Sequence, residues 1–133
     1  LGAKLKTVED LMLTGNKIPF INENDKMKKA LDLITKKKLG VLIAKNSRGK
    51  TTGIITDGQI RRASQNNKNI QNLSVKKVMT KNPISVEKEL LAAKALSIMN
   101  NRKITSLCIH SKNKKNKTLG IIHIHNILEA NIQ

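Results

Sequence analysis

The chain has 133 residues, 38% of them hydrophobic and only one of them Phe, Tyr or Trp, which is enough for one domain with a modest aliphatic core. The longest uninterrupted apolar run, "VLIA" at 41–44, is too short to cross a bilayer, and the single cysteine, Cys108, cannot form an internal disulfide. We therefore expect a cytoplasmic protein that does not enter a membrane, and the opening at Leu1 instead of Met indicates a piece of a longer chain.

The net charge of +17 points first to nucleic acid, because a strongly basic domain is typical of proteins that bind it. However, 22 of the 26 basic residues are Lys, whereas recognition of base edges and phosphates relies on Arg. Base stacking also needs aromatic rings, which this composition lacks. We interpret the dispersed lysines as solvated surface and predict no nucleic-acid partner.

The first predicted elements are a short helical turn, "VEDLM" at 8–12, and an extended stretch around a proline, "IPFI" at 18–21. An amphipathic helix follows, which we expect Asp25 to start. Its apolar residues have helical spacing and are Met27, Ala30, Leu31 and Ile34. Two strands with a turn between them come next, "GVLIA" at 40–44, the turn at 46–50, and "TTGIIT" at 51–56, before a further helix.

The second half repeats this order, beginning with "VKKVM" at 75–79. Apolar residues with the same helical spacing return in a helix that we expect to start near Glu87, at Ala92, Ala95, Leu96 and Met99. The extended stretches of this half are "PISV" at 83–86, "SLCIH" at 106–110 and "LGIIH" at 119–123, with a turn at 111–117.

One phrase shows the repeat directly: "GIITDGQIRRA" at 53–63 returns 67 positions later as "GIIHIHNILEA". Each half reads β-α-β-β-α, and a half of about 60 residues buries too little surface to be stable alone. We therefore predict an α/β (α+β) fold of two repeats related by a pseudo-two-fold axis. The predicted divisions are the end of a preceding domain at 1–7, repeats at 8–64 and 75–133, and a linker at 65–74.

This order, with "GIITDGQI" at the strand-to-helix corner, resembles a tandem pair of cystathionine-β-synthase (CBS) domains over residues 8–130. The phrases "VEDLMLTGNKIPFI", "GIITDGQIRRA", "KVMTKNPISV", "KITSL" and "GIIHIHNIL" resemble the C-terminal CBS pair of the D-arabinose 5-phosphate isomerases. In addition, "LGAKL" resembles the last turn of the sugar-isomerase domain that carries the catalysis in that family. The resemblance implies a regulatory fragment that is not itself an enzyme, so we assign no catalytic residues.

The strand-to-helix corner at Thr56 is the best candidate site. A strand that ends there and leads into a helix near Asp57 presents a hydroxyl, free backbone N–H groups and a positive helix dipole, which together favour an anion. Arg61 and Arg62, one turn further on, favour a phosphate-bearing ligand. The alternative is that Thr56 caps the helix and binds nothing.

The resemblance extends this corner to two ligand sites, because CBS pairs hold nucleotides where one repeat's corner meets the other repeat's proline-marked stretch. One site then comprises Thr56, Asp57, Gln59, Thr80, Asn82, Pro83 and Ile84. The other comprises Thr14, Ile18, Pro19, His123, His125 and Asn126. The Asp that binds ribose in the family is replaced by Gln59 and Asn126, so different ligands, or none, are compatible with these corners.

His110, His123 and His125, together with Cys108, are residue types that bind metal ions. We predict no metal site, because no carboxylate or second cysteine lies at ligand spacing, and Cys108 falls within a strand where a small core residue is expected.

Two functional hypotheses follow. The first is a regulatory module of a D-arabinose 5-phosphate isomerase, which converts ribulose 5-phosphate in the Kdo and lipopolysaccharide pathway. It would sense a nucleotide or nucleotide sugar such as AMP, ATP or CMP-Kdo and use no other cofactor. The second is a structural module that binds no ligand and holds subunits together, as a homodimer through the CBS helices within a tetrameric parent.

Overall fold

The structure is a computed structural model that describes residues 5–131. Within those residues the strands form a four-stranded sheet in the order β1-β2-β3-β4 and a three-stranded sheet in the order β5-β6-β7. The α/β fold with two repeats is confirmed. The chain divides into two compact units, one made of Pro19–Pro83 and the other made of the stretch that ends at Ile18 together with the stretch that starts at Ile84. No helix in the described part of the chain is long and apolar enough to cross a membrane.

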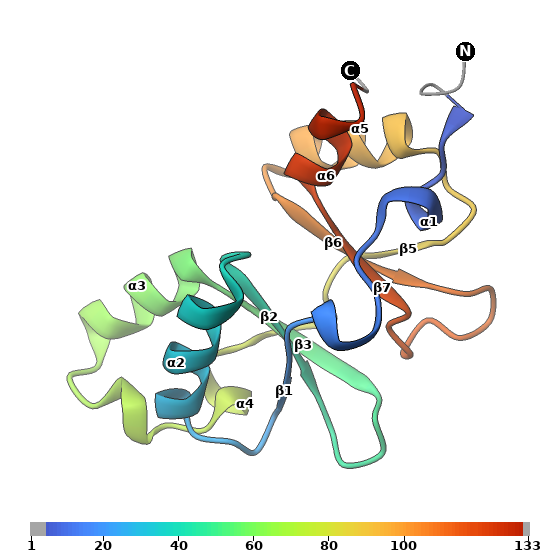
Figure 1. Ribbon diagram of the computed structural model, residues 1–133. Helices are drawn as coiled ribbons and strands as arrows, with labels where there is room; N and C mark the ends of the chain where they lie inside the picture. Colours follow the sequence, from blue (N-terminus) through green and yellow to red (C-terminus); the bar gives the residue numbers. More distant parts are fainter. Residues whose placement is uncertain (1–4, 132–133) are drawn as a thin grey trace. The chain divides into compact units, whose positions relative to one another are not determined.

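The unit Pro19–Pro83 contains the four-stranded sheet and the helices that cover it (Figure 1). Its elements are β1 Phe20–Asn22, α2 Met27–Lys37, β2 Val41–Lys45, β3 Thr51–Thr56, α3 Asp57–Asn66, the 3-10 turn η3 Ile70–Asn72, α4 Val75–Val78 and β4 Thr80–Lys81. β1 runs parallel to β2, while β3 runs antiparallel to both β2 and β4. The apolar face of α2, with Met27 and Ala30, packs on Leu42 and Ile55 of the sheet.

The other unit contains the three-stranded sheet (Figure 1). Its elements are α1 Val8–Leu11, the 3-10 turn η2 Gly15–Lys17, β5 Ser85–Glu87, α5 Ala92–Arg102, β6 Ser106–His110, β7 Gly120–His123 and α6 Ile124–Glu129. Its core combines Ala95 and Met99 of α5 with Leu107 and Ile122 of the sheet. On the other face of β6 lies Cys108, which is 1% exposed, so its predicted burial is confirmed.

Each unit includes the segment that begins the opposite repeat. α4 and β4 begin the second repeat, yet they belong to the unit Pro19–Pro83, where Thr80 lies opposite Ile54 of β3. In the same way Leu13, which belongs to the first repeat, forms a bridge with Ile121 of β7. The chain therefore exchanges these short segments between its two units.

Gly53 and Gly120 are the positions where the exchanged segments pass closest to the strands. A Cβ on Gly53 would lie 2.5 Å from Met79 Sδ and 2.8 Å from the carbonyl oxygen of Thr80. A Cβ on Gly120 would lie 2.8 Å from the carbonyl oxygen of Leu13. Both copies of the repeated phrase therefore begin with Gly, because only Gly leaves room for the backbone of the exchanged segment that passes over the strand.

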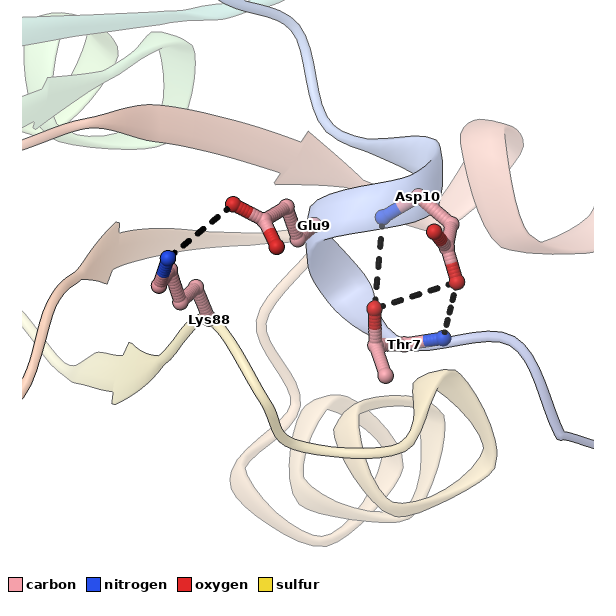
Figure 2. A network of polar contacts seen from close by, with 4 residues as sticks. All are labelled: Thr7, Glu9, Asp10 and Lys88. Carbon is pink, nitrogen blue, oxygen red and sulfur yellow. Dashed lines mark hydrogen bonds and ion pairs between the residues drawn. The ribbon is translucent and has the colours of Figure 1, made fainter.

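The first exchanged segment is held by a capping box and an ion pair, which Figure 2 shows. The Thr7 N–H donates to Asp10 Oδ2 at 2.8 Å, and the Asp10 N–H donates back to Thr7 Oγ1 at 3.4 Å, so α1 begins firmly at Val8. Lys88 Nζ lies 3.5 Å from Glu9 Oε2, which links α1 to the stretch between β5 and α5. The capping box orders the segment itself, whereas backbone bonds attach it to its unit: the Val8 N–H donates to the Leu90 carbonyl and the Leu13 N–H to the Ile121 carbonyl, each at 2.8 Å.

Two predicted helix starts are wrong. α2 begins at Met27 with Lys26 as its N-cap, and Asp25 instead pairs with Lys29 at 3.3 Å. α5 begins at Ala92, because Glu87 belongs to strand β5. Neither true N-cap, Lys26 or Leu91, makes a side-chain cap bond, so the sequence carries no capping signal at these positions.

The predicted linker is more structured than expected. α3 continues to Asn66 and the η3 turn follows at Ile70–Asn72. Ile70 is 6% exposed and belongs to the core of its unit. The burial of Ile70 and the hydrogen bond from the Met27 N–H to the Leu73 carbonyl, at 2.8 Å, hold the connection against α2.

Candidate functional site

The α3 corner, which we define as Thr56, Asp57, Gln59 and Thr80, lies where β3 leads into α3. Thr56 is the N-cap of α3: its Oγ1 accepts the Gln59 N–H at 3.3 Å, and Gln59 Oε1 accepts the Thr56 N–H at 2.9 Å. The Gln59 amide nitrogen donates to Thr80 Oγ1 of β4. The polar groups of Thr56 and Gln59 are therefore bonded to one another and to the exchanged strand.

Charge at this corner comes from Asp57 and Arg62. The Asp57 N–H donates to the Gly40 carbonyl at 3.1 Å, and Asp57 Oδ2 lies 3.0 Å from where a Cβ on Gly40 would be. A guanidinium nitrogen of Arg62 lies 3.3 Å from the point where a Cβ on Gly58 would be. Arg62 thus lies along the first turn of α3. The N–H groups of Asp57 and Gln59 in that turn already donate to Gly40 and Thr56, so the guanidinium and the helix dipole are the features that attract an anion.

The α6 corner, which we define as Ser106, His123, His125 and Asn126, is the equivalent place in the other unit. The His123 N–H donates to Asn126 Oδ1 at 2.8 Å, and His123 Nδ1 accepts the His125 N–H at 3.1 Å, so the imidazole caps α6. The two imidazole rings are stacked with centroids 4.7 Å apart. Burial, and secondarily the neighbouring His125, lower the pKa of His123 below its ordinary value.

Ser106 is a residue that the sequence analysis missed. It lies directly opposite His123 in the antiparallel pair of β6 and β7, so both side chains are on the same face of the sheet. Its hydroxyl oxygen is buried and has no hydrogen-bond partner among the described residues. In the other repeat the position opposite the corner residue, Thr56, is occupied by the apolar Val41.

Farther along the same face of β6 the two repeats also differ. His110 Nδ1 and Ser85 Oγ are hydrogen-bonded to each other in the second repeat. At the equivalent positions of the first repeat, Lys45 Nζ lies 4.3 Å from the centre of the Phe20 ring. His110 is thus engaged with Ser85 while His123 caps α6. Within residues 5–131 no group of three or more His, Cys, Asp and Glu side chains could hold a metal ion.

The remaining predicted site residues are placed as follows. Arg61 is exposed on α3. Asn82 has a left-handed backbone with φ 53°, and it shares the unit Pro19–Pro83 with Pro83, whereas Ile84 begins the next stretch of the other unit. Thr14 is exposed and Ile18 is 6% exposed; both share a unit with the α6 corner, and Pro19 does not. Hydrogen bonds that involve a side chain join the pairs Thr56–Gln59, Gln59–Thr80, His123–Asn126 and His123–His125.

The chain is similar in sequence to one family and to several curated proteins. The family model described as the CBS domain matches residues 8–66 and again residues 75–132. The arabinose 5-phosphate isomerase KdsD of Salmonella typhimurium is 36% identical over 133 residues, which is 99% of this chain and 40% of that protein. KdsD of Escherichia coli K12 is 35% identical over the same share of each chain. The chain thus spans about two fifths of the length of these relatives.

Solved structures share the fold. The CBS-domain containing protein ATU1752 from Agrobacterium tumefaciens superposes with a TM-score of 0.86 at 18% identity, over 99% of this chain and 98% of that one. CBSX2, solved in complex with AMP, gives a TM-score of 0.80 at 20% identity, over 94% and 95%. The CBS pair of MJ0100, solved with 5′-methylthioadenosine and S-adenosyl-L-methionine, gives 0.80 at 18% identity, over 94% of each chain.

Proposed function

Because the chain belongs to the CBS domain family, with two copies of the domain in tandem, we propose that it is the regulatory part of an arabinose 5-phosphate isomerase and that it binds a nucleotide or nucleotide sugar. The observation that carries this proposal is the similarity to KdsD along 99% of the chain. The parent enzyme would convert ribulose 5-phosphate to arabinose 5-phosphate for Kdo and lipopolysaccharide synthesis, and this part of it would carry no catalytic residue.

The α3 corner supports a ligand that contains phosphate. The guanidinium of Arg62 lies against the first turn of a helix ten residues long, where it adds to the positive partial charge of the helix start and offsets the Asp57 carboxylate in the same turn. Backbone N–H groups and a guanidinium are the groups that proteins use for phosphate oxygens. AMP in CBSX2 is a ligand of the kind proposed, whereas the two adenosine compounds in MJ0100 carry no phosphate.

Thermal denaturation with a ligand panel tests the proposal. The panel contains AMP, ATP, CMP, CMP-Kdo and adenosine, each added to this chain and to the whole isomerase. A ligand at one hundred times its Kd adds about 2.7 kcal/mol to the free energy of unfolding, which for a chain of this length raises Tm by roughly 11 °C. We expect at least one compound to do so and to change the rate of isomerisation by the whole enzyme. An unchanged Tm with every compound at millimolar concentration would overturn the sensing role.

A second candidate function, assembly of subunits without a ligand, is favoured by the hydrogen bonds of Gln59. This residue stands where the family carries its ribose-binding Asp, and its amide is already bonded to Thr56 and Thr80. In this proposal the chain forms a homodimer through its CBS helices and holds a tetrameric parent together. Light scattering of the whole enzyme with and without these residues decides it: a loss of subunits on deletion supports assembly, and an unchanged mass contradicts it.

A further inference from the structure

The helices α3 and α6 are two copies of one helix in the repeat, but their outer surfaces differ. The residues that face inward are kept, since an isoleucine of each helix packs against the core of its unit at equivalent positions. The residues that face outward are replaced: Arg61 and Arg62 of α3 correspond to Leu128 and Glu129 of α6. All four are exposed, so the repeat preserved the core and changed the surface.

The end of α6 combines an apolar side chain with negative charge. Leu128 is 49% exposed, which is unusual for a large apolar residue of this chain. Glu129 follows it and makes no ion pair with any described residue. No Lys or Arg lies in the last turn of α6, so no cation of that turn offsets the carboxylate or the negative partial charge of the helix end.

The outer side of α3 is basic. Arg62 is turned along its own helix towards Gly58, which leaves Arg61 as the arginine that is available to another molecule. Arg61 also makes no ion pair with a described residue. The helices α2 and α3 together carry six Lys and Arg against two Asp, whereas α5 and α6 carry two against one Glu. The two units therefore present helices of unequal charge.

A second copy of the chain presents the same surfaces, and a two-fold axis repeats every contact between two copies. When like helices meet, Arg61 faces Arg61 and Glu129 faces Glu129, so the charges repel. When α3 meets α6, the guanidinium of Arg61 faces the carboxylate of Glu129 and the end of α6, and this attraction occurs twice in each dimer. Leu128 leaves water in both arrangements, because the aliphatic part of Arg61 covers it as a second Leu128 would. Charge therefore decides between them.

We infer that two copies of this chain associate with α3 of each copy against α6 of the other, so that Arg61 of one copy pairs with Glu129 of the second. The inference rests on the second candidate function, assembly of subunits, and names the surfaces that meet. In this arrangement the unit Pro19–Pro83 of one copy contacts the unit of the second copy that contains the three-stranded sheet.

Charge reversal tests the pairing, with the dimer Kd of the protein measured by sedimentation equilibrium. Arg61→Glu and Glu129→Arg each place like charges together in two contacts, and each should weaken the dimer about tenfold. The double variant keeps the net charge of +17 and restores opposite charges in both contacts, so its Kd should return to that of the unsubstituted protein. The matched control, Lys76→Glu, makes the same charge change on an exposed residue of α4 and should leave the dimer unchanged.

Disulfide formation gives an independent measurement of which helices meet. Cys108 is buried and does not compete, so a single Cys is introduced as Arg61→Cys in one preparation and as Glu129→Cys in another. With oxidised glutathione as the oxidant, we expect covalent dimers in the mixture of the two preparations and none in either preparation alone. Covalent dimers from either single variant alone would show that like helices meet and would overturn the inference.

The outcomes separate the inference from the proposed functions. A dimer that the single charge reversals leave unchanged, or that the double variant does not restore, overturns the inference while assembly itself stands. A protein that stays monomeric at about 0.1 mM, a concentration at which a Kd of 1 μM gives a nearly complete dimer, overturns both the inference and assembly. Neither result affects the binding of a nucleotide, which the ligand panel tests by itself.

Discussion

Substitution of Gly53 by Ala should destabilise the unit Pro19–Pro83 through one added methyl group. The new Cβ would lie 2.5 Å from Met79 Sδ and 2.8 Å from the carbonyl oxygen of Thr80. Met79 can rotate away, but Thr80 is held by its pairing with Ile54, so the backbone of β4 must move. Overpacking of this kind costs about 1–3 kcal/mol, which corresponds to a decrease in Tm of roughly 4–12 °C for a chain of this size.

Gly58→Ala is the matched control, because it adds the same methyl group in the same unit. Its Cβ would meet only the flexible end of Arg62, at 3.3 Å, and Gly58 lies in α3, where Ala is preferred over Gly by about 0.5–1 kcal/mol. We therefore expect Tm to be unchanged or slightly raised. Both variants are compared by circular dichroism on heating and by urea unfolding. A Gly53→Ala protein that melts with or above the unsubstituted protein would refute the close approach of β4 to β3.

The remaining predictions concern single titratable groups. Burial raises the pKa of the Cys108 thiol to about 12, so a thiol reagent at pH 8 should modify it only as fast as the protein unfolds, and rapid labelling in native buffer would contradict its burial. The pKa of His123 is lowered by burial and then by His125, so its contribution to the free energy of unfolding is complete above about pH 6.5 and decreases as the pH falls below that value. His123→Asn, which supplies a side-chain oxygen to cap α6 in place of Nδ1, should remove this part of the pH dependence in urea titrations, and an unchanged slope would exclude His123 as its source. The pKa of the Asp10 carboxyl lies below its ordinary value because it accepts the Thr7 backbone N–H, so its contribution is complete above about pH 4 and is lost as the pH falls through the lower value. An NMR titration that gives Asp10 an ordinary or raised pKa would contradict the capping box in Figure 2.

The order of the elements could be predicted from the sequence because it depends on local patterns. The apolar residues of α2 and α5 recur with helical spacing, and β2 and β6 are short apolar runs bounded by turn residues. The starts of α2 and α5 could not be predicted correctly, because their N-caps, Lys26 and Leu91, are not residue types that cap helices. Ile70 in the predicted linker could have indicated that this stretch packs on the core, because an isolated apolar residue in a polar segment is often buried.

The exchange of segments could not be predicted, because a strand of two residues, Thr80 and Lys81, has no pattern that says which sheet it joins. Gly53 and Gly120 were the sequence features that could have indicated it, because a glycine inside a strand rich in β-branched residues often marks the close approach of another backbone. At the sites, the strand that ends at Thr56 and leads into a helix predicted the corner, and Thr56 with Gln59 forms a capping box there. The unpaired hydroxyl of Ser106 depends on which neighbours meet in three dimensions, and no sequence pattern carries that information.

The division of the chain between its units also has a consequence for the order in which they fold during synthesis. The unit Pro19–Pro83 is one continuous stretch, so every contact it needs is available once Pro83 has left the ribosome. The other unit joins the two ends of the chain: the Val8 N–H donates to the Leu90 carbonyl, 82 positions later, and the Ala92 N–H donates to the Lys6 carbonyl. Those bonds close a loop that contains the whole first-made unit, and α1 must remain unattached until α5 emerges. A ribosome that releases the chain from its N-terminus therefore completes the unit Pro19–Pro83 before the unit whose two stretches flank it in the sequence.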